Sequence, residues 1–267
     1  MNVWQEDVFL RFATIDCSDR LTLGAAVGLC QDAATSHAEI LNVGRDSMYK
    51  SGQAWILSRF SVFIEKRPLY RTNISLKSWP SGIEKLFALR DFLIEDESGN
   101  AMLRGRSSWL VIDVNKRRPI RIESMSDMLL INEGLGVFNS SPSALAVRDN
   151  LSISGERIAA YSDIDYYGHV NNVRYVQWLL DICPHDLLCK TNQIRFDINF
   201  LNETLPGEKV ELYSVNIDPS NYIPDNASTE QKKDYPVKPV AGFAFEGRKS
   251  GSPAGQAVYR AELRLGD

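Results

Sequence analysis

One short segment of the chain carries the residue types that acyl transfer needs. In SDIDYYGHVNNVRYVQWLLD, residues 162–181, two aspartates precede a Gly-His pair, and His169 stands at the start of a predicted amphipathic helix. Backbone N–H groups in the first turn of a helix lack internal partners and carry the positive end of the helix dipole. Such a turn can stabilise the oxyanion that forms when water attacks a thioester carbonyl. The segment therefore predicts an acyl-transfer site.

The elements in front of this segment predict a sheet curled around a helix. A strand is predicted over residues 3–14 and a helix over 21–41. Most of the first four helical turns are small or apolar, whereas a surface helix would show a polar face. We therefore expect a sheet to wrap this helix and the small residues to let the sheet approach its backbone. Four strands rich in β-branched and aromatic residues follow, at 54–66, 72–79, 85–96 and 101–114.

The same order of elements then repeats. Residues 138–150, FNSSPSALAVRDN, are aperiodic and predict a linker, which we place at 136–150. After the linker come a strand at 151–161, the helix at about 170–182, and strands at 193–201, 209–216, 239–246 and 257–265. The polar segment 218–238 is expected to be an extended loop. Internal duplication predicts two similar units: a first half, residues 1–135, and a second half, residues 151–267.

Composition excludes several classes of protein. The 267 residues carry a formal net charge of −4, which disfavours general nucleic-acid binding because that needs a basic excess. The basic run Lys116-Arg117-Arg118, with Arg121, is either a local docking patch or a solvated hairpin end. No apolar stretch reaches the ~18–20 residues of a membrane span.

The cysteines predict a reducing compartment and no metal. None of the four forms a CxxC pair, and the N-terminal residues lack the order of a signal peptide. Reduced thiols in the cytoplasm are therefore expected. Cys183, His185 and Cys189 suggest zinc, but no fourth ligand has suitable spacing, so we expect no metal.

Several blocks of the sequence resemble known thioesterases. The pattern DxDxxGHVNNxxYxxW at 163–178 resembles the helix-start motif of hotdog thioesterases, both small acyl-CoA enzymes and acyl-acyl-carrier-protein (acyl-ACP) thioesterases. The acyl-ACP family is also similar in its doubled layout, its length, and the blocks at 31–44, 59–70 and 104–122. The resemblance implies an α+β fold, a tandem (double) hotdog in which each curled antiparallel β-sheet wraps a central helix. His37 in the first half has no GHVNN sequence to match the one at His169, so we expect the first half to contribute the wall of an acyl pocket without catalysis and the second half to be catalytic.

The resemblance also implies roles for single residues. Asp165 and His169 correspond to the catalytic Asp and His, and Glu203, in FLNETLPGE, corresponds to a further acidic residue of the site. Two departures matter: Tyr167 stands where plant members have Asn, and Thr204 stands where they have Cys. Because a threonine without a dedicated base is a poor nucleophile, direct attack by water is expected. A carboxylate near a helix start is stabilised in its charged form, which favours Glu203 slightly over Asp165 as the base.

Each residue also has a structural interpretation. Asp165 can hold the turn before the helix, and Glu203 can be a solvated charge beside a hairpin. For His169, the anion-binding turn favours function. Asn171 and Asn172 are expected to cap the helix and orient the turn. We expect the substrate to be bound by the turn and the helix start, residues Tyr167, Gly168, Val170, Asn171 and Asn172.

The function that the resemblance implies is hydrolysis of fatty acyl-ACP to release free fatty acid, without a metal or organic cofactor. The implied partner is an acyl carrier protein bearing a fatty acyl chain, with no nucleic acid or membrane span involved, and a homodimer is left open as the assembly. Two alternatives remain at this point: an acyl-CoA thioesterase, and a non-catalytic module that only binds acyl chains.

Overall fold

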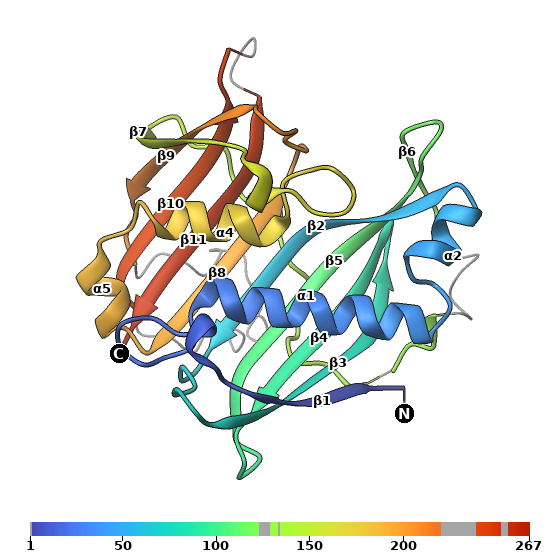
Figure 1. Cartoon of the computed structure of the whole chain (residues 1–267), viewed down its shortest axis with the longest axis horizontal. Coiled ribbons are helices and arrows are strands. Elements are labelled where there is room, and N and C mark those ends of the chain that lie inside the picture. The colour runs from blue at the N-terminus through green and yellow to red at the C-terminus, as the bar shows by residue number, and fades with distance from the viewer. Residues whose placement is uncertain (1, 123–128, 133, 220–238, 252–255) are drawn as a thin grey trace.

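The described strands form a single antiparallel sheet. The computed structural model describes residues 2–122, 129–132, 134–219, 239–251 and 256–267. Within these residues the sheet has 11 strands in the order β1-β3-β4-β5-β2-β8-β11-β10-β9-β7, with β6 paired to β5. Helices α1 and α4 lie side by side on one face of this sheet (Figure 1).

The first half of the chain follows the predicted order of strand, helix and four strands. Its elements are β1 (Trp4–Phe9), α1 (Leu23–Ile40), α2 (Arg45–Lys50), β2 (Gln53–Ile64), β3 (Asn73–Glu84), β4 (Phe87–Glu95), β5 (Ala101–Asp113) and β6 (Arg118–Ile120). The Thr22 hydroxyl accepts the Ala25 N–H at 3.0 Å and so begins α1. Asp96 Oδ1 accepts the N–H groups of Ser98 and Asn100 at 2.9 and 2.8 Å, which closes the β4–β5 hairpin at the predicted turn.

The second half repeats this order. Its elements are β7 (Ser152–Ile158), α4 (Asn172–Leu180), α5 (His185–Lys190), β8 (Gln193–Phe200), β9 (Lys209–Asn216), β10 (Pro239–Lys249) and β11 (Ala257–Gly266). Most long elements fall within a few residues of the predicted ranges. The exceptions are β1, which ends at Phe9 and is followed by a 3-10 helix at Phe12–Thr14 where the prediction continued the strand to residue 14, and β3, which continues to Glu84 beyond the predicted end at residue 79. The short helices α2 and α5 and the short strand β6 were not predicted. Of the predicted loop 218–238, residues 220–238 lie outside the described residues.

The two halves join edge to edge. Strand β2 pairs with β8 in a register that runs from Arg59↔Asn199 to Ile64↔Ile194. The buried side chains of α1, α4 and both parts of the sheet form a continuous hydrophobic core. The predicted fold, an α+β tandem hotdog with a helix against each half of a curled antiparallel sheet, is confirmed by this arrangement and by the structural relatives described below.

The small residues of α1 have a different neighbour from the one expected. We predicted that they admit the sheet, but a Cβ added at Gly24 would lie 3.1 Å from Cγ of Gln177, and one at Gly28 would lie 3.9 Å from Cγ2 of Val173. Both neighbours belong to α4. At these two glycines the small residues therefore admit the second helix, and they are part of the contact between the halves.

The segment predicted as a linker packs against the sheet. It has no helix or strand over 136–150. Phe138 is buried against Phe63 of β2, and Asn199 of β8 bonds to both the Leu145 N–H and the Ser143 carbonyl, at 2.7 and 3.0 Å. The segment therefore contacts strands of both halves. None of the helices in the described residues is both long and apolar enough to cross a bilayer.

Candidate active site

A cavity of about 770 Å³ lies between the two halves. This volume is within the range of ligand pockets for small molecules, about 300–1,000 Å³. One part of its wall comes from the turn before α4 and from the β8–β9 loop of the second half, and the other part from α1, α2, β2, β4 and β5 of the first half. The predicted site residues that line the cavity are Asp165, Tyr167, His169, Val170, Asn171, Asn172 and Glu203.

Asp165 shapes the turn that presents His169. Its Oδ1 accepts the Tyr167 N–H at 2.9 Å, its carbonyl accepts the Gly168 N–H at 3.0 Å, and its own N–H donates to the His169 carbonyl at 2.8 Å. Gly168 has a φ of +84° and open space around the position of a Cβ. It is not among the residues that line the cavity. Gly168 therefore serves the left-handed turn rather than a close approach of the substrate.

The helix begins after His169. Asn171 is the N-cap, and its Oδ1 accepts the Val173 N–H at 2.9 Å. Helix α4 starts at Asn172, two residues later than predicted, so His169 lies in the turn before it. From α1, the Gln31 side chain donates to the Asn171 Oδ1 at 3.5 Å. The first half of the chain thus contacts the cap of the helix that borders the site.

Few N–H groups of this turn are available to a ligand. Those of Gly168, Val170, Asn171, Val173 and Arg174 already donate to acceptors within the chain. Among the described residues, we find no acceptor for the N–H groups of His169 and Asn172. Both residues line the cavity. These two amides are therefore the candidates for oxyanion donors.

Glu203 lies beside His169 because the two loops are hydrogen-bonded to each other. The Val170 N–H donates to the Thr204 carbonyl at 2.9 Å. This bond brings the preceding residues, His169 and Glu203, next to each other. The result is a distance of 3.3 Å between His169 Nε2 and Glu203 Oε2. On the other side, Arg117 Nη2 donates to Glu203 Oε1 at 3.0 Å.

Thr204 is fully buried, and its hydroxyl has no hydrogen-bond partner among the described residues. It does not line the cavity. A buried hydroxyl without a base cannot meet a substrate in the cavity, so the geometry agrees with the argument against a threonine nucleophile.

The rim of the cavity also joins the two halves. The guanidinium of Arg45, the first residue of α2, lies 4.4 Å from the ring centroid of Tyr166. The rings of Tyr166 and Tyr167 are themselves 4.2 Å apart. Arg45 thus lies over the loop that carries the candidate catalytic residues, with the geometry of a cation–π contact.

Sequence reasoning missed the residues that the first half contributes. Arg45 contacts the loop of the site without any local signal in the sequence, and Arg117, although noted in the basic run, was not linked to Glu203. Asp32 of α1 also lines the cavity, and the pKa of its carboxyl group is raised by partial burial and by the charge of Glu6. A basic run was visible at 116–118, but only the pairing of strands shows that it reaches Glu203.

The fold and the site define a double-hotdog protein with an Asp, a His and a Glu in the wall of a cavity between its halves. Residues 1–127 match the model of the acyl-ACP thioesterase N-terminal domain, and residues 152–240 match that of the C-terminal domain. The chain therefore belongs to the acyl-ACP thioesterase family.

Curated relatives of this family share limited identity with the chain. A palmitoyl-acyl carrier protein thioesterase of Cuphea hookeriana is 24% identical over 203 residues, which cover 70% of this chain and 48% of the relative. An oleoyl-acyl carrier protein thioesterase of Arabidopsis thaliana is 23% identical, covering 69% of this chain and 55% of the relative. The chain spans about half the length of the curated relatives that it matches.

Solved structures share the fold over the whole chain. An acyl-ACP thioesterase from Bacteroides thetaiotaomicron has a TM-score of 0.80 at 24% identity and covers 99% of this chain and 98% of its own. A 12:0-ACP thioesterase from Umbellularia californica has a TM-score of 0.78 at 17% identity, with coverage of 99% and 97%. These likenesses establish the double hotdog for all of the described elements.

Proposed function

We propose that the chain hydrolyses the thioester of fatty acyl-ACP and releases free fatty acid. The observation that carries this proposal is the cavity, whose lining combines Asp165, His169 and Glu203 of the second half with a mixed wall from the first half. In that wall, apolar side chains such as Val43, Trp55 and Leu89 outnumber polar ones such as Asp32 and Arg90. A thioester at Asp165, His169 and Glu203 would leave its acyl chain against these apolar side chains. The first half then contributes the acyl pocket and the second half the chemistry, as the sequence predicts.

The proposed reaction is a single displacement by water. Glu203 takes a proton from the water while the water oxygen attacks the thioester carbon. Asp165 is already engaged by the Tyr167 N–H, which favours Glu203 as the base and Asp165 as the residue that orients the turn. His169, 3.3 Å from Glu203, passes a proton to the thiolate sulfur as the C–S bond breaks. The N–H groups of Asn172 and His169 stabilise the oxyanion.

No acyl-enzyme forms in this mechanism. Thr204 is buried away from the cavity, and the cavity wall contains no cysteine. Iodoacetamide should therefore leave hydrolysis intact, and Thr204→Ala should retain most of the turnover. Trapping a covalent acyl group on any residue of the chain, by mass spectrometry of a quenched reaction, would disprove the direct attack of water.

We infer that the partner is an acyl carrier protein, which the resemblance implies to be acidic. Arg118 and Arg121 are exposed and lie on or beside the β6 hairpin. Arg117 of the same hairpin contacts Glu203 at the cavity, so the two exposed arginines are placed to meet an acidic surface there.

We place the enzyme in the cytoplasm because the described cysteines are free thiols, which a reducing compartment maintains. Sedimentation of the purified chain tests whether it forms the homodimer that the sequence leaves open.

Hydrolysis of matched acyl-ACP and acyl-CoA substrates tests the proposal directly. We expect kcat/KM to be higher for the carrier-bound chain, with free fatty acid as the product. A preference for acyl-CoA would replace the proposal by an acyl-CoA thioesterase. Tight acyl binding without turnover of either substrate would indicate a binding module instead.

A further inference from the structure

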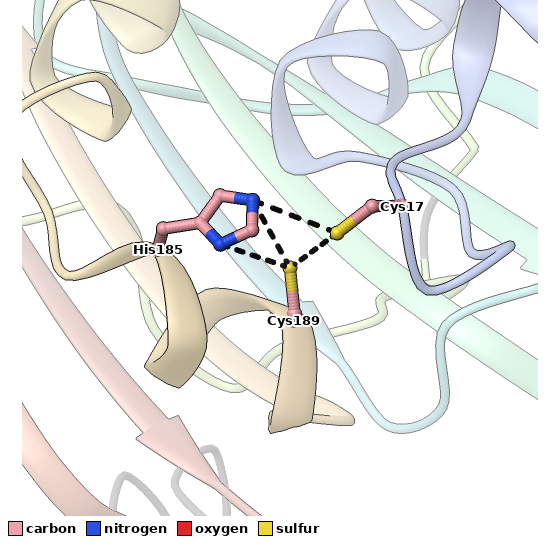
Figure 2. Close-up of side chains that lie close together, drawn as sticks. All are labelled: Cys17, His185 and Cys189. Atoms are coloured by element: carbon pink, nitrogen blue, oxygen red, sulfur yellow. Dashed lines mark hydrogen bonds between the residues drawn. The ribbon is translucent and has the colours of Figure 1, made fainter.

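Three metal-binding side chains meet on the surface, away from the cavity. The Sγ atoms of Cys17 and Cys189 lie 2.7 Å apart, and His185 Nε2 lies 3.6 Å from each of them. Figure 2 shows the three side chains pointing toward one another, Cys17 from the loop before α1 and the other two from α5. None of the three lines the cavity. The cluster is therefore separate from the candidate active site.

The fold replaces one member of the set that the sequence suggested. Cys183, which we considered with His185 and Cys189, directs its Sγ to the Leu179 carbonyl at 3.3 Å. Cys17 takes its place although it lies 172 residues from Cys189 in the chain. The expectation of no metal rested on spacing along the sequence, and spacing does not reveal Cys17, which the structure brings to His185 and Cys189 from the other half; the set still contains three protein ligands.

We propose that Cys17, His185 and Cys189 bind a Zn²⁺ ion, with water as the fourth ligand. Thiolate and imidazole are ligands that Zn²⁺ prefers, and three protein ligands with an open fourth position are an established type of zinc coordination. The ion would connect the loop before α1 to helix α5, and so join segments of the two halves.

The distances within the cluster suit this ion. Bonds of about 2.3 Å to sulfur and about 2.0–2.1 Å to nitrogen, at tetrahedral angles, place N and S ligands about 3.6 Å apart. Both His185 Nε2 to Sγ distances are 3.6 Å. The two sulfurs must separate from 2.7 Å to about 3.8 Å. Rotation about the side-chain torsion of Cys17, which is exposed on a loop, can provide this change.

A buried arginine holds the two ligand-bearing segments together. Arg67 is 3% exposed. Its guanidinium binds the Asp16 carboxylate, next to Cys17, and donates to the Leu188 carbonyl, next to Cys189, at 3.0 Å. A single side chain therefore fixes the neighbours of both sulfur ligands in the absence of any ion. Arg67 touches none of the three ligands, but it keeps the two segments that carry the sulfurs close to each other.

Local structure orients the ligands further. Asp16 Oδ1 accepts the N–H and the hydroxyl of Ser18 at 2.9 and 2.6 Å, which forms a tight turn with Cys17 inside it. His185 and Cys189 are four residues apart on α5, so they share one face of this helix. The ligands are thus held by a turn and a helical turn rather than by free loops.

Metal binding by the full chain tests the proposal. With thiols kept reduced by a phosphine, we expect Co²⁺ to bind at one ion per chain and to give the absorption of thiolate coordination, and Zn²⁺ to displace it. Zn²⁺ should also raise the melting temperature, because an ion that binds only the folded chain stabilises it. Cys17→Ser and Cys189→Ser should each weaken Zn²⁺ binding by at least about tenfold. Cys183→Ser, the matched control, should bind as the wild type does.

Three outcomes would overturn the proposal. The reduced wild-type chain could fail to bind Zn²⁺ while Cys17 and Cys189 form a disulfide in air, which would make the pair a redox couple. Cys17→Ser could bind Zn²⁺ normally, or Cys183→Ser could lose binding as fully as Cys17→Ser does. These readouts do not depend on thioester hydrolysis, so they are independent of the proposed function.

Discussion

Glu203 is the residue on which the proposed chemistry depends most, because its carboxylate contacts both His169 and Arg117. A positioned general base contributes about 10²–10⁴-fold. We therefore expect Glu203→Gln, His169→Ala and Asp165→Ala each to lower kcat by roughly 10²-fold or more. Stability should change little in Glu203→Gln and His169→Ala, since these side chains leave no large apolar cavity. Asp165→Ala also loses the hydrogen bond from the Tyr167 N–H and should cost about 0.5–1.5 kcal/mol. Steady-state kinetics and thermal melts check both parts.

Two controls sharpen this prediction. Glu156→Gln changes an exposed carboxylate on β7, outside the cavity, and should leave kcat unchanged. Asp165→Asn keeps an acceptor for the Tyr167 N–H, so it should retain more activity than Asp165→Ala if Asp165 orients the turn. Double variants should be hardly worse than the worst single one, because residues that act as a unit are non-additive. Normal turnover in His169→Ala would put the active site elsewhere.

His37, unlike His169, is buried in the first half of the chain and has a structural role. It is 2% exposed, and its Nδ1 accepts from Arg90 at 3.1 Å. Burial and the charge of Arg90 lower the pKa of His37 from 6.5 to about 4. Between these pH values the unfolded chain takes up a proton that the folded chain does not. The stability contributed by neutral His37 is therefore complete above pH 6.5 and is lost as the pH falls toward 4.

This linkage gives a prediction for pH. The loss attributable to His37 amounts to at most ~3 kcal/mol. His37→Gln should therefore show a shallower fall in the free energy of unfolding between pH 6.5 and 4, measured by urea titration. Turnover at neutral pH should stay near normal, because His37 lies outside the catalytic set. Parallel curves for wild type and variant would show that His37 does not titrate in this way.

At the scale of elements, the contact between α1 and α4 rests on glycines that differ in the room they leave. A Cβ at Gly28 would meet Val173 at an ordinary 3.9 Å, whereas one at Gly24 would lie 3.1 Å from Gln177. Alanine in a helix interior is favoured over glycine by roughly 0.5–1 kcal/mol. Gly28→Ala should therefore raise the free energy of unfolding by about that amount, and Gly24→Ala should gain less or nothing. Equal gains at both positions would mean that Gln177 moves freely.

The β5–β6 hairpin carries two adjacent arginines with different surroundings. Arg117 donates to Glu203, while Arg118 is exposed beside it. Exposed ion pairs are worth about 0.2–1 kcal/mol, so Arg117→Gln should lower kcat only ~2- to 5-fold. Arg118→Gln should instead raise KM for acyl-ACP and spare kcat, with an effect that weakens at high salt. Identical kinetic effects of the two variants would contradict this division.

The elements themselves could be predicted because their signals are local. β-branched and aromatic runs between turn residues predict β2 to β5, and a Ser- and Pro-containing stretch predicts the segment between the halves. Helix α5, with only six residues, carries too short a pattern to be recognised. The role of Gly24 and Gly28 also escaped prediction, because no local pattern states whether a helix packs on a sheet or on another helix.

At the scale of the whole molecule, the contacts that matter most join residues that are distant in sequence. The Arg117–Glu203 pair spans 86 residues and the Cys17–Cys189 pair 172. Both depend on how the two halves pack, β2 against β8 and α1 against α4, and no spacing within one half reveals that packing. The motif 163–178 predicted where the chemistry lies, but the partners from the first half required the assembled fold.

The joined sheet also sets the direction of the cavity in which we propose that the acyl chain binds. From the β8–β9 loop with Glu203, the cavity wall passes to β2 at Trp55, then to β5 at Trp109, and then to β4 at Ala88. Neighbouring strands lie about 4.8 Å apart, so Ala88 lies three strand spacings, ~14 Å, from the β8 side. Ala88 therefore lies toward the distal end of the pocket, where the end of a long acyl chain would reach.

Enlarging Ala88 should shorten the preferred acyl chain. Ala88 is 7% exposed and lines the cavity. The added carbons of Ala88→Leu would therefore fill part of the cavity in which we propose that the acyl chain binds. Excluding two methylenes costs ~1.6 kcal/mol, which is roughly tenfold in kcat/KM for the longest chains. Shorter chains should be spared, as a panel of acyl-ACP lengths would measure. Ala101→Leu, on β5 but outside the cavity, is the matched control. A uniform loss across all lengths would show that Ala88 supports the fold without limiting the chain.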